Sequence, residues 1–151
     1  VYVARGAARE TLDRPQMKQA LFAALDALGP RNRVLVLPPD FTRFHSQAGL
    51  LTQYVWEYYG DRLAAVLPAL GTHSPMTEAQ LREMFGAMPL RLFRPHDWRN
   101  DVVTLGTVPP EYVRELTEGR LDFEWPVQVN KLLVEGGFDL ILSIGQVVPH
   151  E

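Results

Sequence analysis

Residues Leu63–Gln80 read LAAVLPALGTHSPMTEAQ and combine an apolar run, a short polar turn and the start of a helix. The run Leu63–Leu70 is almost unbroken, which is typical of a strand buried on both faces of a sheet. Thr77 followed by Gln80 is the pattern of a capping box at a helix start. Apolar residues then recur at helical spacing at Leu81, Met84, Phe85 and Met88. His73 therefore stands in a strand-to-helix connection, where open α/β sheets bind their ligands.

Strands and helices alternate along the rest of the chain. Asp13 can cap a helix that carries Pro15 in its first turn and ends at Gly29. A second helix, rich in aromatic residues, is expected from about Ser46 to Tyr59. Further strands are expected at Val34–Leu37, Leu90–Phe93, Val102–Leu105 and Phe138–Ile144, and Val127–Leu133 fits either a strand or a helix start.

This alternation predicts an α/β fold with a mainly parallel sheet and flanking helices, although the strand order cannot be read from the sequence. A chain of 151 residues is expected to form a single α/β domain over residues 1–151. The chain opens on Val1 and closes on Glu151 soon after an apolar strand, where an α/β protein would continue into a loop and helix. We therefore expect a fragment of a two-domain protein; a trimmed chain that is complete as a domain is the alternative.

Composition limits the classes of function. With 46% hydrophobic residues and a net charge of −3, the chain can bury a core and has no basic stripe of the kind that binds nucleic acid. No apolar run reaches the ~20 residues that span a membrane. The absence of cysteine excludes disulfides, thiolate zinc sites and cysteine nucleophiles, and it is expected of a cytoplasmic protein.

Polar residues follow several of the expected strands. Asp40 and Arg43 come after Val34–Leu37, and His73 comes after Leu63–Leu70. His96 and Asp97 follow Leu90–Phe93, and His150 follows Phe138–Ile144. If these strands are parallel, their carboxyl ends meet at one edge of the sheet and form a site there. Each residue also has an ordinary interpretation, because loop histidines are often solvated and an aspartate can bond its own turn.

Five segments, in this order, resemble the nickel-pincer lactate racemase family: PDFTR, GTHSPMTEAQ, PHDWRND, VQVNKLL and IGQVVPHE. The resemblance implies two α/β domains with the active site in the cleft between them, so that the second domain of the same chain is a partner. It implies a nickel-pincer nucleotide cofactor, in which a thiolated pyridinium mononucleotide holds the nickel. The implied reaction racemises or epimerises a 2-hydroxy acid by reversible hydride transfer, with histidine acid/base help.

The resemblance also implies roles for single residues. His73 is the expected base for the hydroxyl proton, since imidazole titrates near neutral pH, and Asp40 would orient it. Arg43 offers a guanidinium fork for the substrate carboxylate. A second family histidine, expected upstream of the VNK segment, is missing here, and His96 is the plausible substitute.

Three residues are implied in holding the cofactor. Lys131 aligns with the lysine that bonds the cofactor covalently in some members, with a surface lysine as the alternative. Thr72 lies in the GTH element and is expected to contact the cofactor. His150 resembles the nickel ligand of the family, and imidazole suits nickel.

Two other classes of function stay open at the level of sequence. One is a metal-assisted hydrolase or lyase that uses the histidines directly as ligands, although no HxH or HxxxH pair is present. The other is a non-catalytic α/β module that binds a ligand at the same sheet edge.

Overall fold

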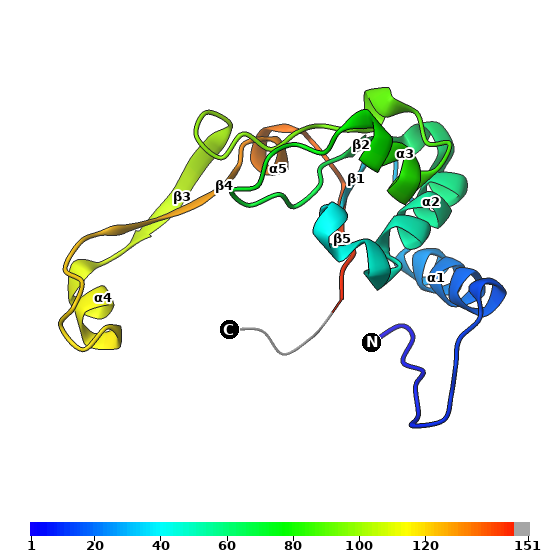
Figure 1. The fold of residues 1–151 in the computed structure, drawn as a ribbon, viewed down its shortest axis with the longest axis horizontal. Coiled ribbons are helices and arrows are strands. Elements are labelled where there is room, and N and C mark those ends of the chain that lie inside the picture. The colour runs from blue at the N-terminus through cyan, green and yellow to red at the C-terminus, as the bar shows by residue number, and fades with distance from the viewer. Residues whose placement is uncertain (147–151) are drawn as a thin grey trace. The chain divides into compact units, whose positions relative to one another are not determined.

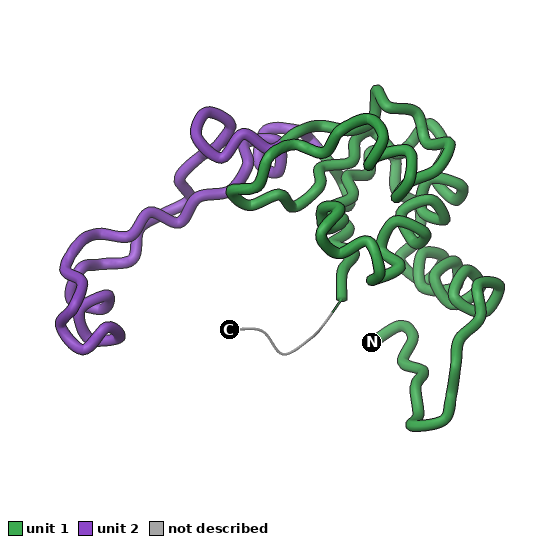
Figure 2. The backbone as a smooth tube through the Cα atoms, viewed as in Figure 1, with its two compact units in different colours: residues 1–95, 138–151 green, residues 96–137 purple. Residues whose placement is uncertain are grey.

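A computed structural model describes residues 1–146, and the chain falls into two compact units. The first unit contains Val1–Pro95 together with the chain from Phe138 onward, and the second contains His96–Gly137. Figure 2 shows the two units in separate colours. His150, which was predicted to bind nickel, lies outside the described residues.

The first unit is built on a three-stranded parallel sheet in the order β2-β1-β5 (Figure 1). The central strand β1 (Val34–Leu37) pairs with β2 (Leu63–Val66) on one side and with β5 (Leu140–Ser143) on the other. Its four residues are apolar and almost all buried, as the sequence pattern indicates. The expected α/β class with a parallel sheet is confirmed.

Three helices pack with this sheet, and their ends follow the local sequence. Helix α1 (Arg14–Leu28) begins with a capping box from Asp13 and ends at Gly29. Helix α2 (Ala48–Tyr59) ends at Gly60, as expected, and α3 (Glu78–Phe85) begins with the capping box of Thr77 and Gln80. These reciprocal side-chain bonds satisfy backbone N–H groups that a helix start leaves free.

The core lies between one face of the sheet and these helices. Val34 and Val36 point to the same face of β1, since side chains alternate along a strand. Buried residues of all three helices join them in one cluster, namely Leu25, Val55, Tyr59, Met84 and Phe85. Helices α2 and α3 approach closely at Gly49, where a Cβ atom would lie 2.2 Å from the carbonyl oxygen of Met84. Only glycine fits this contact without a shift of the backbone.

Two expected strands differ from the structure. The strand expected over Leu63–Leu70 ends at Val66, and the pairing continues beyond it through backbone hydrogen bonds and an isolated bridge between Pro39 and Ala69. The strand expected over Leu90–Phe93 is wrong, because Leu90–Leu92 form a 3₁₀ turn. Pro89 fixes the entry to this turn, and its carbonyl accepts the N–H of Leu92.

The second unit is a two-stranded antiparallel hairpin with two short helices. Strand β3 (Val102–Val108) is longer than expected and pairs with β4 (Trp125–Asn130). Helix α4 (Pro110–Leu116) lies between the strands in the chain and was not predicted, although a proline in the first turn suits a helix. The ambiguity over Val127–Leu133 ends with both options: β4 stops at Asn130, and α5 (Leu132–Glu135) follows.

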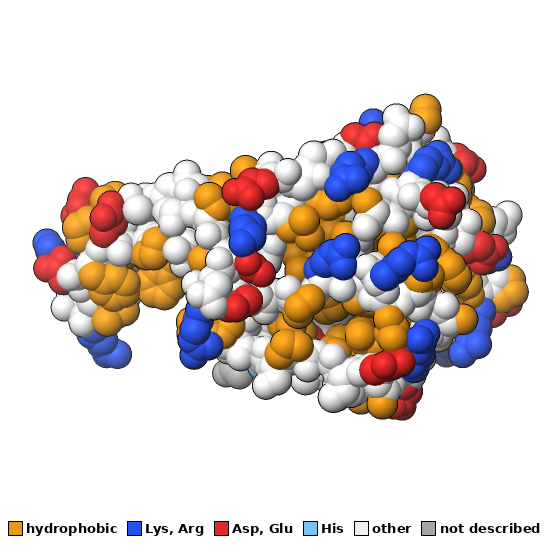
Figure 3. Space-filling view, turned by 90° about the horizontal axis from the view of Figure 1, so that it is seen from above, with side chains coloured by type: hydrophobic (Ala, Val, Ile, Leu, Met, Phe, Trp, Pro, Cys, Tyr) orange, Lys and Arg blue, Asp and Glu red, His pale blue; other side chains and the backbone are white. Residues whose placement is uncertain are grey.

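The surface mixes charges with apolar side chains. On the face shown in Figure 3, lysine and arginine lie among acidic and apolar residues. Several large apolar side chains of the second unit are exposed, among them Leu105, Leu116, Phe123 and Trp125. Among the described residues, no helix has the length and apolar character needed to cross a membrane.

Candidate active site

The central feature of the candidate site is a contact between His73 and Asp40 in the first unit. The Nδ1 atom of His73 lies 2.6 Å from Oδ2 of Asp40, which is hydrogen-bonding distance. The His73 side chain is 59% exposed, whereas Asp40 as a residue is only 7% exposed. The buried carboxylate therefore holds the imidazole at Nδ1, and more than half of the His73 side chain remains accessible to a ligand.

The ends of β1 and β2 bring these two residues together. The backbone N–H of Leu67 donates to the carbonyl of Val36, and that of Ala69 donates to the carbonyl of Pro38. The segments that follow β1 and β2 therefore stay paired beyond the ends of the strands. Asp40 lies just past the paired segment that follows β1, and His73 lies past the paired segment that follows β2. The sequence expectation that both lie past the carboxyl ends of parallel strands agrees with this arrangement.

Local turns then direct the side chains. Gly71 has a φ of +57°, which favours glycine, and the N–H of His73 donates to the carbonyl of Leu70. In the loop after β1, Asp40 is the N-cap of a 3₁₀ helix over Phe41–Ser46. Its Oδ1 atom accepts hydrogen bonds from both the backbone N–H and the hydroxyl of Thr42. One carboxylate oxygen thus fixes the turn, and the other remains for His73.

Electrostatics keep Asp40 ionised. Burial by itself would raise the pKa of this carboxyl, but hydrogen bonds from the Thr42 hydroxyl, from His73 and from the Thr42 N–H outweigh it. The pKa of Asp40 is therefore below its ordinary value. A carboxylate can only accept hydrogen bonds, so the Nδ1 atom of His73 must carry a proton. In the neutral imidazole, Nε2 is then the free base.

Arg43 and Thr72 lie on the same two loops and are exposed. Arg43 is three residues past Asp40 and interrupts the 3₁₀ helix with φ −109° and ψ 28°. Thr72 lies in the turn directly before His73. Among the residues that the structure describes, no side-chain hydrogen bond or ion pair ties down Arg43. Its guanidinium is therefore available to an anionic ligand.

His96 belongs to the second unit, where it contacts Asn130 at the end of β4. The amide nitrogen of Asn130 lies 2.9 Å from Nδ1 of His96, and the Asn130 amide oxygen accepts the N–H of Leu132. The second bond fixes the orientation of the amide, so its NH₂ group donates to His96. His96 then accepts at Nδ1, and its other ring nitrogen carries the proton. The Oδ1 atom of Asp97 accepts hydrogen bonds from the backbone N–H groups of Arg99 and Asn100 in its own turn.

Lys131 directly precedes α5 and forms an ion pair. Its Nζ atom lies 2.6 Å from Oδ1 of Asp101, and its backbone N–H donates to the Asp101 carbonyl. The hydrogen bond to the Asp101 carboxylate and the charge of that group raise the pKa of Lys131. Lys131 is thus an exposed ammonium group, held beside the β3–β4 hairpin of its unit.

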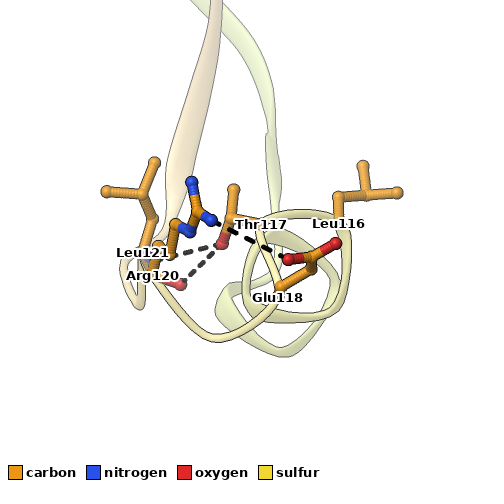
Figure 4. A pocket seen from close by; sticks show the side chains of 5 residues that line it. All are labelled: Leu116, Thr117, Glu118, Arg120 and Leu121. Atoms are coloured by element: carbon orange, nitrogen blue, oxygen red, sulfur yellow. Dashed lines mark hydrogen bonds and ion pairs between the residues drawn. The ribbon is translucent and has the colours of Figure 1, made fainter.

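Other candidate sites have less suitable chemistry. Within residues 1–146, no group of three or more His, Asp or Glu side chains lies close enough to hold a metal ion. An open pocket of about 540 Å³ in the second unit is lined by Leu116, Thr117, Glu118, Arg120 and Leu121 (Figure 4). There the Thr117 hydroxyl bonds Val113 and Leu121 of the backbone, so it is already engaged in the turn.

Sequence reasoning missed three residues that shape these contacts. Thr42 fixes Asp40, Asn130 orients His96, and Asp101 pairs with Lys131. Thr42 and Asn130 stand inside the PDFTR and VQVNKLL segments, next to residues that were assigned roles. Thr42 could have been identified from the sequence, because a threonine two residues after an aspartate can donate a hydrogen bond to that carboxylate within a turn. No comparable signal pairs Asn130 with His96, since 34 positions separate them.

The fold and the site define an α/β domain that carries an exposed histidine, held by a buried carboxylate, past the carboxyl ends of a parallel sheet. The profile described as lactate racemase N-terminal domain matches residues 4–151. The chain belongs to this family. No match was found among proteins with curated descriptions.

Two solved structures are similar to the chain. A protein from Thermotoga maritima, known from a crystal structure, is 32% identical over 93% of this chain, with a TM-score of 0.82. The lactate racemase apoprotein from Thermoanaerobacterium thermosaccharolyticum is 21% identical over 78% of this chain, with a TM-score of 0.53, and this second likeness concerns the fold alone. The chain spans 35% and 26%, respectively, of the lengths of these two proteins.

Proposed function

We propose that this chain is the N-terminal part of an enzyme that racemises or epimerises a 2-hydroxy acid with a nickel-pincer nucleotide. The observation that carries the proposal is the His73–Asp40 contact on the GTH and PDFTR loops. Family membership supports the reaction class. A second domain of the full-length protein would complete the site, in agreement with the fraction of the similar structures that the chain spans.

His73 is the proposed group for proton transfer. Its Nδ1–H donates to Asp40, which leaves the Nε2 lone pair to accept the proton of the substrate hydroxyl. The imidazolium that forms gains from the adjacent carboxylate, because opposite charges at this distance attract. An exposed imidazole also gives the substrate access from the open side of the loop. When bound, the cofactor supplies a pyridinium carbon that accepts and returns the hydride.

Arg43 is the proposed anchor of the substrate carboxylate. A guanidinium can form two parallel hydrogen bonds with a carboxylate, which fixes the orientation of the acid as well as its position. This arrangement would present the C2 hydroxyl of the substrate to a base on the neighbouring loop. A lysine at position 43 would keep the charge but lose the paired geometry.

The chain's donor chemistry fits the cofactor in two ways. His150 offers an imidazole for nickel, and Lys131 offers an exposed primary amine. A covalent bond through Lys131 requires the neutral amine, so the ion pair with Asp101 must open before the bond forms. We propose Thr72 as a further cofactor contact, and His96 as the second acid/base group that a reaction on two faces requires. Without cysteine, the chain suits the reducing cytoplasm, where we place the protein.

The test uses the full-length protein, produced in cells that make the cofactor. Incubation with one enantiomer of a 2-hydroxy acid should give the racemate, and chiral chromatography measures this conversion. The purified protein should contain nickel. His150→Ala should lose the nickel and, with it, the activity. His45→Ala is the matched control, because His45 is exposed and forms no part of the proposed site. Full activity in a nickel-free preparation would contradict the proposal.

A further inference from the structure

The first unit contains an apolar pocket that the proposed reaction does not use. Its volume is about 200 Å³, and it lies past the carboxyl end of β2. Its apolar lining includes Pro68, Leu70, Met76, Leu81 and Phe93. Sites at the carboxyl ends of parallel strands are favoured places for ligands. The position of the pocket is therefore typical of a binding site.

The walls of this pocket are well supported. The ring of Phe93 packs against the buried ring of Phe85 with centroids 4.9 Å apart, and the Phe93 backbone bridges to Val66. Leu70 is 2% exposed and accepts the N–H of His73 through its carbonyl. The pocket thus exists in the folded chain and shares a loop with His73.

Among the residues that the structure describes, Arg94 is the only charged one that lines the pocket. Its Nη1 atom donates to the carbonyl of Arg91, and its backbone N–H donates to the carbonyl of Val66. The guanidinium side chain is exposed, and no acidic side chain within residues 1–146 pairs with it. A cation at the edge of an apolar pocket suits a ligand with an apolar body and one negative charge.

We infer that this pocket binds a small monocarboxylic acid with a branched aliphatic or aromatic body, whose carboxylate bonds Arg94. The volume of the pocket limits the size of the ligand to less than that of a drug-sized molecule, because sites for such molecules occupy ~300–1,000 Å³. Within residues 1–146, no lining residue other than Arg94 has a polar side chain that could select a hydroxyl group. The pocket should therefore accept both a 2-hydroxy acid and its deoxy analogue. The inference stands whether or not the proposed reaction is correct.

Titration calorimetry on the full-length protein tests this inference. 4-Methylpentanoate should bind with roughly millimolar affinity, which suits so small a ligand. Acetate, which has no apolar body, and neutral 4-methylpentanamide should both bind more weakly. 2-Hydroxy-4-methylpentanoate should bind like 4-methylpentanoate; a requirement for its hydroxyl would assign the binding to the proposed catalytic site and overturn the inference.

Variants and a local probe then place the ligand. Arg94→Gln should weaken 4-methylpentanoate about 2- to 5-fold, as expected for an exposed ion pair, while Arg91→Gln, three residues away and outside the pocket, should leave it unchanged. Pro75→Phe should weaken binding by filling the pocket from its exposed side. In methionine-methyl NMR, the ligand should shift Met76 and leave Met17 unaffected. No shift of Met76 up to about 10 mM ligand, well above the expected millimolar dissociation constant, would overturn the inference.

Discussion

His73 and Asp40 are 33 positions apart in the sequence, yet Nδ1 of the imidazole lies 2.6 Å from the carboxylate. The contact arises because the segments that follow β1 and β2 remain paired as far as Pro39 and Ala69. Each loop then needs only a short turn to bring its side chain to the other. The orientation of His73 therefore depends on the pairing of β1 with β2, which positions Asp40, and not only on the loop that carries His73.

The ionisation of Asp40 should make part of the stability dependent on pH. Its pKa is lower in the folded chain than its ordinary value, so ionised Asp40 stabilises the fold above its unfolded pKa of ~3.9. This contribution is lost as the pH falls through the folded pKa. Asp40→Asn should therefore lower the free energy of unfolding most at pH 7, and the difference from the natural chain should shrink below about pH 4.

Urea unfolding at several pH values measures this dependence. Asp61→Asn is the control, because it removes one exposed carboxylate with no bond to another side chain in the described part of the chain. A loss of stability in Asp40→Asn that stayed constant from pH 7 to pH 3 would show that the lost contacts do not depend on the charge of Asp40.

Much of the first unit could be predicted from local sequence. The cap residue Asp13, the capping box of Thr77 and Gln80 and one four-residue apolar run indicated the starts of α1 and α3 and the position of β1, because these signals concern neighbouring residues. The stretch Leu90–Phe93 was assigned wrongly because a short, largely apolar stretch fits a strand and a partly buried 3₁₀ turn equally well. The hairpin could not be predicted, since the pairing of β3 with β4 depends on partners far along the chain.

The contact between Asn130 and His96 fixes a tautomer that can be measured. In the natural chain, neutral His96 should carry its proton on Nε2, because the Asn130 amide donates to Nδ1. Asn130→Ala removes that donor, and the two tautomers should then become mixed. Ring ¹⁵N chemical shifts distinguish the tautomers, and His45 serves as the internal control. A proton on Nδ1 of His96 in the natural chain would mean that the contact is absent in solution.

The ion pair of Lys131 should slow its reaction with acylating reagents. Asp101→Asn removes the group that raises the pKa of Lys131, so more free amine is present at a given pH. Acetylation of Lys131 should then become about 2- to 5-fold faster, the range expected for an exposed ion pair. The chain contains only one other lysine, Lys18, which pairs with Glu57 and is an internal control for mass spectrometry. Equal acceleration at both lysines, or none at Lys131, would contradict this account.

The candidate site was predictable only as far as its chemistry follows from position. Asp40 and His73 could be placed past strand ends, since the strands themselves were predictable. The role of Thr42 depends on one carboxylate oxygen being used by the turn and the other by His73, which requires the folded backbone. The pairing of Lys131 with Asp101 depends in the same way on the β3–β4 hairpin.

The racemisation rate of full-length His73→Ala, measured together with its nickel content, tests the central claim most directly. Loss of the proposed base should lower the rate by ~10²–10⁴, the usual contribution of acid/base help. Nickel should remain, since the proposed ligand is His150, and His45→Ala should behave like the natural protein. A His73→Ala protein that keeps its full rate, or that loses nickel as His150→Ala does, would contradict the assignment of His73 as the proton-transfer group.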